Sequence, residues 1–127
     1  MALKIGVMAE SFRSENFRKA AETAAAIGAS GMQVYITDIS PLLTIDQMTD
    51  EKIREVLDIV KSNGLIFSAV CGDMGYGFDD KEQNPHFIDR SMRILDIAKK
   101  LDCSIVTTHI HEVPVEENEK KQTMRDA

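Results

Sequence analysis

The sequence lacks a long apolar run, and this absence limits where the protein can act. No hydrophobic stretch approaches the roughly 20 residues that a helix needs to cross a bilayer. The N-terminus, Met-Ala-Leu-Lys-Ile-Gly-Val, reads directly as a β-strand and lacks the layout of a secretory signal peptide. We therefore expect a protein of the cytoplasm that has no membrane partner.

Positive charge is also scarce. Fifteen lysines and arginines face 21 aspartates and glutamates, which gives a net charge of −6. The phosphates of nucleic acids require a basic protein face, and anionic membrane surfaces attract basic segments in the same way. We therefore expect neither nucleic acid nor a membrane surface as a partner.

Only two cysteines are present. Cys71 ends one expected strand and Cys103 begins another. If these strands are parallel, the two sulfur atoms lie at opposite ends of the sheet, because each residue advances a strand by about 3.3 Å. We expect two free thiols, as a reducing compartment would keep them. Cys71 has no identifiable base beside it, so we expect a small buried hydrophobe there and no nucleophile.

The glycine patterns of nucleotide-binding proteins are missing as well. No Gly-x-Gly-x-x-Gly follows the first expected strand, and no phosphate-loop motif occurs. Both absences argue against a dinucleotide-binding enzyme and against a nucleotide hydrolase.

The residues that are present indicate a single α/β domain over residues 1–127, since 43% of them are hydrophobic. Apolar strands alternate with amphipathic helices. The expected strands are Leu3–Ala9, Gly31–Ile36, Leu65–Val70 and one that begins at Cys103 or Ser104. The expected helices run from about Ser14 to Ile27, from the N-cap Thr49 to Asn63, and from the N-cap Asn84 to Leu101. This alternation predicts parallel strands joined by right-handed crossovers.

Four finer expectations concern side-chain faces and burial. Leu3, Ile5 and Val7 should share one face of the first strand, and the third strand should be buried on both faces. The third helix should pack through one side, formed by Phe87, Ile88, Ser91, Leu95, Ala98 and Leu101. A helix within residues 115–127 would have almost nothing apolar to bury.

Polar side chains follow the strands at the point where each strand ends. Glu10 follows the first strand, Asp73 lies in a glycine-rich loop after the third, and His109 ends the fourth. Glu10 could contact a polyol, Asp73 could shape a substrate wall, and the His109 imidazole could bind a sugar hydroxyl or a metal. The alternatives are an acidic residue before a helix, an ordinary mobile loop, and a histidine hydrogen-bonded at the sheet edge without a ligand. A single histidine does not make a metal site, because zinc-type sites require three or four ligands.

Four segments resemble the N-terminal half of xylose-isomerase-like TIM barrels. They are Lys4-Ile-Gly-Val7, Gly31-Met-Gln-Val34, Ala69-Val-Cys-Gly-Asp-Met-Gly75, and Thr107-Thr-His-Ile110 with Val113-Pro114. The superfamily includes sugar isomerases and epimerases and the family-2 apurinic endonucleases. The resemblance implies a (β/α)8 barrel of which about the first four βα units are present, since a complete barrel takes about 250 residues.

The resemblance also implies a function. In the complete barrel a divalent metal (Mn, Mg, Co or Zn) assists aldose–ketose isomerisation or ketose epimerisation, and the later strands supply most metal ligands and the proton-transferring glutamates. We therefore expect a truncated half that is inactive alone, has no catalytic residue of its own and binds no metal tightly. The expected substrate-side residues are Glu10, Asp73 and His109, with His109 as the one metal-ligand candidate. His111 stands where the family usually has glycine, so the local loop geometry is expected to depart from the family pattern.

Two other interpretations are compatible with the sequence. Four parallel strands leave two open edges, so a non-catalytic half-barrel could form a homo-oligomer that closes an eight-stranded barrel. A self-standing flavodoxin-like domain would show the same alternation, with an open sheet and helices on both of its faces. The endonuclease branch is the weakest enzyme interpretation, because the protein is acidic.

Overall fold

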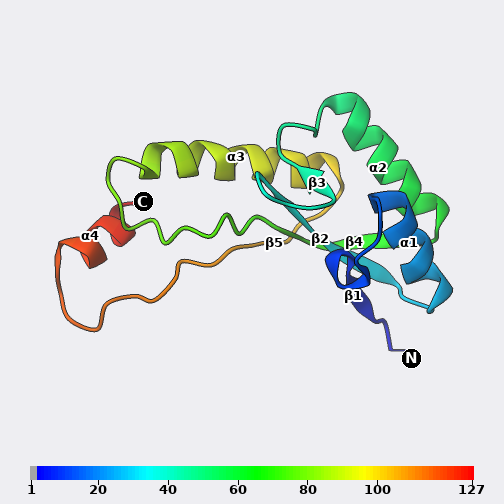
Figure 1. Ribbon diagram of the computed structural model, residues 1–127, viewed down its shortest axis with the longest axis horizontal. Coiled ribbons are helices and arrows are strands. Elements are labelled where there is room, and N and C mark those ends of the chain that lie inside the picture. Colours follow the sequence, from blue (N-terminus) through cyan, green and yellow to red (C-terminus); the bar gives the residue numbers. More distant parts are fainter. Residues whose placement is uncertain (1–2) are drawn as a thin grey trace.

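The computed structural model describes residues 3–127 (Figure 1). Parallel strands and covering helices alternate along the chain, as the sequence predicts. The elements are β1 (Gly6–Met8), the 3-10 helix η1 (Ala9–Phe12), α1 (Phe17–Ala26), β2 (Gly31–Thr37), β3 (Leu43–Thr44), α2 (Asp50–Ser62), β4 (Ile66–Cys71), α3 (Asn84–Lys100), β5 (Val106–Thr107) and α4 (Glu119–Asp126). Within this part of the chain, no helix combines the length and the apolar character that crossing a membrane requires.

The strands form one parallel sheet in the order β1-β2-β4-β5. β1 pairs with β2 from Gly6↔Gly31, and β4 pairs with β5 at Cys71↔Thr107. The two-residue β3, which the sequence did not indicate, extends the sheet beside the end of β2. A flavodoxin-like sheet would place its first strand between two others. The observed order follows the chain, so the flavodoxin-like alternative is wrong and the arc of a barrel is confirmed.

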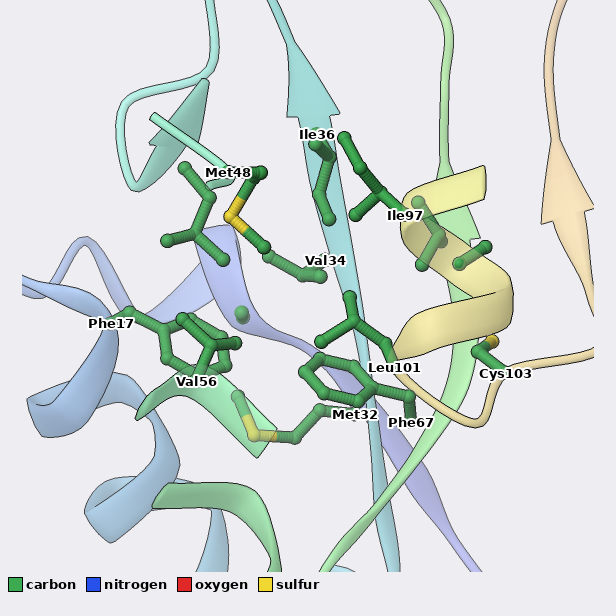
Figure 2. Packing of buried hydrophobic residues seen from close by; sticks show 14 of the residues in the cluster. Phe17, Met32, Val34, Ile36, Met48, Val56, Phe67, Ile97, Leu101 and Cys103 are labelled. Carbon is green, nitrogen blue, oxygen red and sulfur yellow. The ribbon is translucent and has the colours of Figure 1, made fainter. Parts of the chain in front are cut away.

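The helices pack on one face of this arc (Figure 2). β2 directs Met32, Val34 and Ile36 toward them, and all three are fully buried. The cluster continues through Phe17 of α1, Val56 of α2 and Ile97 of α3. Alternation along β2 therefore turns the side chains of Gln33 and Tyr35 to the opposite face, which corresponds to the interior of a barrel.

Side-chain caps explain where the helices begin. Thr49 Oγ1 accepts the backbone N–H of Lys52 at 3.2 Å, which confirms it as the N-cap of α2. The expectation for α3 was wrong by one residue, since Gln83 precedes the helix and Asn84 is its first residue. Asn84 Nδ2 instead donates to the carbonyl of Phe78 at 2.9 Å, so this side chain fastens the preceding loop.

Leu3 and Ile5 are exposed, because β1 begins only at Gly6 as an edge strand of three residues and no described element covers that end. Two expectations about burial were wrong. On α3 the exposed residues include Ile88, Met92 and Leu95, whereas Ile94 and Ile97 are buried. The apolar arc of this helix is wider than the face that meets the sheet, so periodicity alone did not identify the buried part. Ile66 is also exposed, so β4 is not buried along its whole length.

Arginine side chains of α3 fasten the helix to the segment between β2 and α2. Arg90 pairs with Asp38 and, at 2.9 Å, with Asp46. Arg93 donates to the carbonyl of Met48 at 2.8 Å. The position of α3 over the sheet is therefore fixed by polar contacts as well as by the core.

Beyond β4 and β5 the chain leaves the packed layer. The chain forms two extended passes beneath α3, residues 72–83 and residues 108–127, and the second of these ends in α4 (Figure 1). We call the two passes together the arm. A Cβ atom at Gly77 would lie 3.2 Å from the carbonyl oxygen of Ile110, so the two passes of the chain are close. Salt bridges Lys81–Glu119 at 3.2 Å and Lys120–Asp79 at 2.6 Å join α4 to the loop before α3. Tyr76 and Phe78 also pack against Phe87 of α3, so the arm is held by charge together with a few aromatic contacts.

Candidate functional site

A group of polar side chains lies at the carboxyl ends of the strands, and we call it the polar rim. Glu10 lies in η1 directly after β1, and Tyr35 lies near the end of β2. Asp73 follows β4 by two residues, and His109 follows β5 by two residues. Because the strands are parallel and adjacent, these ends meet at one edge of the sheet. The three residues expected from the sequence, Glu10, Asp73 and His109, are members of this rim.

Glu10 is anchored by one carboxylate oxygen. Its Oε1 accepts the backbone N–H of Tyr35 at 2.9 Å. Its Oε2 is buried and has no hydrogen-bond partner in the structure. Burial raises the pKa of this carboxyl, and the hydrogen bond from Tyr35 only partly offsets that effect. Glu10 therefore offers an oxygen that can accept a hydrogen bond or, when protonated, donate one.

Tyr35 is a rim residue in addition to the three that the sequence predicted. It is the register partner of Cys71 on β4, so the two side chains are neighbours on the face away from the helices. The pKa of Tyr35 is raised, first by the Cys71 thiol, then by burial and by the charges of Asp73 and Glu10. The alternation of β2, in which Met32, Val34 and Ile36 face the helices, was the signal that places Tyr35 at the rim.

Asp73 and His109 form a direct pair. Asp73 Oδ2 lies 2.5 Å from His109 Nδ1, and Asp73 Oδ1 accepts the backbone N–H of Gly75 at 2.9 Å. The bond to His109, with a smaller contribution from Gly75, lowers the pKa of Asp73 below its ordinary value. The side chain of His109 is 71% exposed and that of Asp73 only 20%. The imidazole is thus the accessible member of the pair.

His111 does not continue the line of His109. β5 ends at Thr107, and His111 adopts a left-handed backbone conformation with φ of 57°. A Cβ atom at Gly77 would lie 3.3 Å from the His111 Cβ, so His111 is directed at the other pass of the arm. The left-handed backbone is the physical reason that glycine suits this position.

The side chains present do not complete a metal site. Among residues 3–127, no three or more His, Cys, Asp or Glu side chains are grouped so that they could hold one ion. Metal ligation by His109 therefore stays a prediction. The two cysteines, Cys71 and Cys103, are both buried and free, which confirms the expectation from the sequence.

Comparisons with known proteins place this rim in a recognised fold. A search of curated proteins finds no match. Among solved structures, a xylose isomerase domain protein from Planctomyces limnophilus matches with a TM-score of 0.72 and 16% sequence identity. The match covers 94% of this chain and 45% of that one, so the chain spans less than half the length of its structural neighbour. The family model for the xylose isomerase-like TIM barrel matches residues 21–127. The chain therefore belongs to the xylose isomerase-like TIM barrel family.

Proposed function

We propose that this chain forms the substrate-side half of a sugar isomerase or epimerase and binds a sugar or sugar phosphate at its polar rim. One observation carries the proposal: Glu10, Asp73 and His109 gather at the carboxyl ends of parallel strands in a xylose isomerase-like fold. Active sites of TIM barrels are built at this end of the strands. The protein would work in the cytoplasm, where Cys71 and Cys103 would stay reduced.

The rim has the chemistry to hold a polyol. Sugar hydroxyls both donate and accept hydrogen bonds, and specific sites place a few polar groups around an otherwise apolar surface. The exposed His109 ring supplies one polar contact at this edge, and the unpaired but buried Oε2 of Glu10 would supply a second if a ligand displaced the atoms that cover it. The aromatic ring of Tyr35 lies beside them in register with Cys71 and offers a face for a sugar ring.

In this proposal the 127-residue chain binds the sugar but does not convert it on its own. The resemblance implies a divalent metal in the complete barrel, but the side chains of residues 3–127 do not form a ligand set that would hold one. Proton transfer between adjacent sugar carbons requires a positioned base, and no pair of carboxylates with that geometry is assigned to this chain. Measurable conversion of D-fructose or D-xylose by the 127-residue protein would contradict this part of the proposal.

Binding can be tested by NMR on the 15N-labelled chain, titrated with D-fructose, D-xylose and fructose 6-phosphate. We expect chemical-shift changes centred on Glu10, Tyr35 and His109. The variant His109→Asn should lose most of these changes, whereas His86→Asn should keep them. His86 is a matched control because it is exposed in the first turn of α3 and packs against Phe87. Shift changes that spare the rim, or that survive His109→Asn, would contradict sugar binding at this site.

A second proposal, self-association, rests on the open sides of the arc. Among residues 3–127, β1 pairs only with β2 and β5 only with β4, so each offers a free edge. Exposed apolar side chains accompany these edges: Leu3, Ile5, Ile66 and Ile105 on or beside the strands, and Ile88, Met92 and Leu95 on α3. The structural neighbour is about twice as long as the matched part. A second copy of the chain would therefore supply four strands with complementary edges and close an eight-stranded barrel with two-fold symmetry.

Analytical ultracentrifugation tests the self-association. We expect a dimer for the unmodified chain and a monomer for Leu95→Glu, which places a charge in the exposed stripe of α3. Ile39→Glu is the matched control, because Ile39 is also an exposed aliphatic residue, at 81% against 48% for Leu95, but lies between β2 and β3. A monomer at all concentrations for the unmodified chain would contradict the proposal.

A further inference from the structure

Both carboxylate oxygens of Asp73 are already engaged within the chain. Oδ1 accepts from the Gly75 backbone at 2.9 Å, and Oδ2 meets His109 Nδ1 at 2.5 Å. An ionised carboxylate only accepts hydrogen bonds, so His109 must donate from Nδ1. The side chain of Asp73 is also mostly covered, whereas that of His109 is mostly exposed. A ligand at the rim would therefore meet the imidazole first.

We propose that Asp73 is a positioning residue that fixes the tautomer of His109, so that Nδ1 carries the proton and Nε2 presents an acceptor at the rim. The hydrogen bond made by one imidazole nitrogen sets the state of the other. Both Asp73 oxygens act as acceptors in this arrangement, Oδ1 for the Gly75 N–H and Oδ2 for His109. The step from tautomer to sugar recognition rests on the proposed function, because Nε2 would accept a hydrogen bond from a sugar hydroxyl.

The glycine-rich loop explains why this arrangement is stable. Gly75 donates its backbone N–H to Asp73 Oδ1, a local turn that aspartate side chains commonly form with the residue two positions on, and its φ of 75° is one that glycine adopts without steric cost. This bond fixes Oδ1, and the planar carboxylate then directs Oδ2 toward His109. The contact joins residues that are 36 positions apart in the sequence. It also ties the start of the β4–α3 loop to the segment that follows β5.

The variant Asp73→Asn gives a sharp test because the amide has one acceptor and one donor end. The Asn oxygen should keep the bond from Gly75, which leaves the NH2 group facing His109. Nδ1 must then accept, and the proton moves to Nε2. An amide in place of a histidine-orienting carboxylate is known to select the wrong tautomer in this way. A purely structural role for Asp73 would leave the His109 tautomer unchanged.

The measurement is long-range 1H–15N NMR of the histidine-labelled chain at about pH 9, which is well above the ordinary pKa of an imidazole. We expect the proton on Nδ1 of His109 in the unmodified protein and on Nε2 in Asp73→Asn. Asp80→Asn is the matched control: its Oδ1 accepts the backbone N–H of Glu82 at 2.9 Å, but no hydrogen bond joins Asp80 to a histidine in the structure. In this control the proton should stay on Nδ1 of His109, as in the unmodified chain.

The outcomes separate this inference from the proposed function. A tautomer switch without sugar binding supports the role of Asp73 and contradicts the sugar site. An unmodified chain with the proton on Nε2 of His109 overturns the inference, whatever the sugar titration shows, and this result does not depend on whether the variant folds. If both proposals hold, Asp73→Asn should weaken fructose binding about tenfold, the loss expected for one well-placed hydrogen bond.

Discussion

The packed layer and the arm of this protein are stabilised by different forces. In the layer formed by β2, β4 and the three helices α1, α2 and α3, side chains such as Val34, Val56 and Ile97 are fully buried. In the arm, Val115 is 92% exposed, and salt bridges such as Lys120–Asp79 hold the segments together. The polar rim lies where the two regions meet. Glu10 and Tyr35 take their positions from the packed strands, whereas His109 depends on one polar partner.

The largest expected difference between the regions concerns unfolding. Ile97→Ala should lower the free energy of unfolding by about 2–5 kcal/mol, because it leaves a cavity in a fully buried cluster. Val115→Ala in the arm should change it by no more than about 0.5 kcal/mol. Urea denaturation followed by circular dichroism measures both. Equal losses for the two variants would mean that the arm is as tightly packed as the layer.

His111→Gly should stabilise the arm. The residue holds φ of 57°, which is costly for any side chain with a Cβ atom, so glycine should gain up to about 1 kcal/mol. The gain should appear as up to about fivefold slower hydrogen exchange of amides in residues 108–118. Glu112→Gly, at a neighbouring position without positive φ, should have the opposite effect. Faster exchange in His111→Gly would show that the imidazole contributes a contact of its own.

Glu10→Gln should change how stability depends on pH. Burial raises the pKa of Glu10 in the folded state, so the folded protein binds the proton more strongly than the unfolded chain. Stability is then lost as the pH rises from the ordinary carboxyl value of 4.5 through the raised one. Glutamine keeps an oxygen for the Tyr35 N–H and does not ionise. The free energy of unfolding of the variant should therefore equal that of the unmodified protein in acid and exceed it near pH 7. The exposed Glu15→Gln is the control, and an identical pH profile for Glu10→Gln and the unmodified chain would contradict this account.

The smallest expected effect lies in α4. Bonds from Arg125 and Lys121 lower the pKa of Glu117 to about 2. Glu117 therefore stabilises the folded arm above the ordinary pKa of 4.5, and this contribution is lost as the pH falls through about 2. Glu117→Gln should lower the helical content of α4 at neutral pH, as seen in its Cα chemical shifts. The adjacent Glu116→Gln should not, and high salt should reduce the difference.

The sequence predicted the packed layer better than the arm. Apolar runs identified β2 and β4, and Thr49 marked the start of α2, because these signals are local. The sequence did not predict η1 and β3. A one-turn helix and a two-residue strand are too short to show a hydrophobic periodicity, and contacts with neighbouring elements determine their conformation. The prediction of the buried face of α3 was wrong for the same reason. The apolar arc of the helix includes Leu95, but packing against the sheet buries the side that carries Ile94.

At the rim, the positions were predictable and the partners were not. Strand ends in a parallel sheet meet at one edge, so Glu10, Asp73 and His109 could be assigned to it from their places after strands. The hydrogen bond between Asp73 and His109 depends on the paths of two loops that are 36 residues apart. The bond from Tyr35 to Glu10 depends on how η1 turns back after β1. Such tertiary contacts have no signature in a single sequence.

The central claim is that one edge of a parallel arc gathers the rim residues, and proton–proton contacts in NMR spectra of the unmodified chain test it most directly. We predict contacts across Gly6–Gly31, Met32–Phe67 and Cys71–Thr107, together with contacts from the His109 ring to Asp73. Strand contacts in another order, or a His109 ring without contacts to Asp73, would contradict the claim.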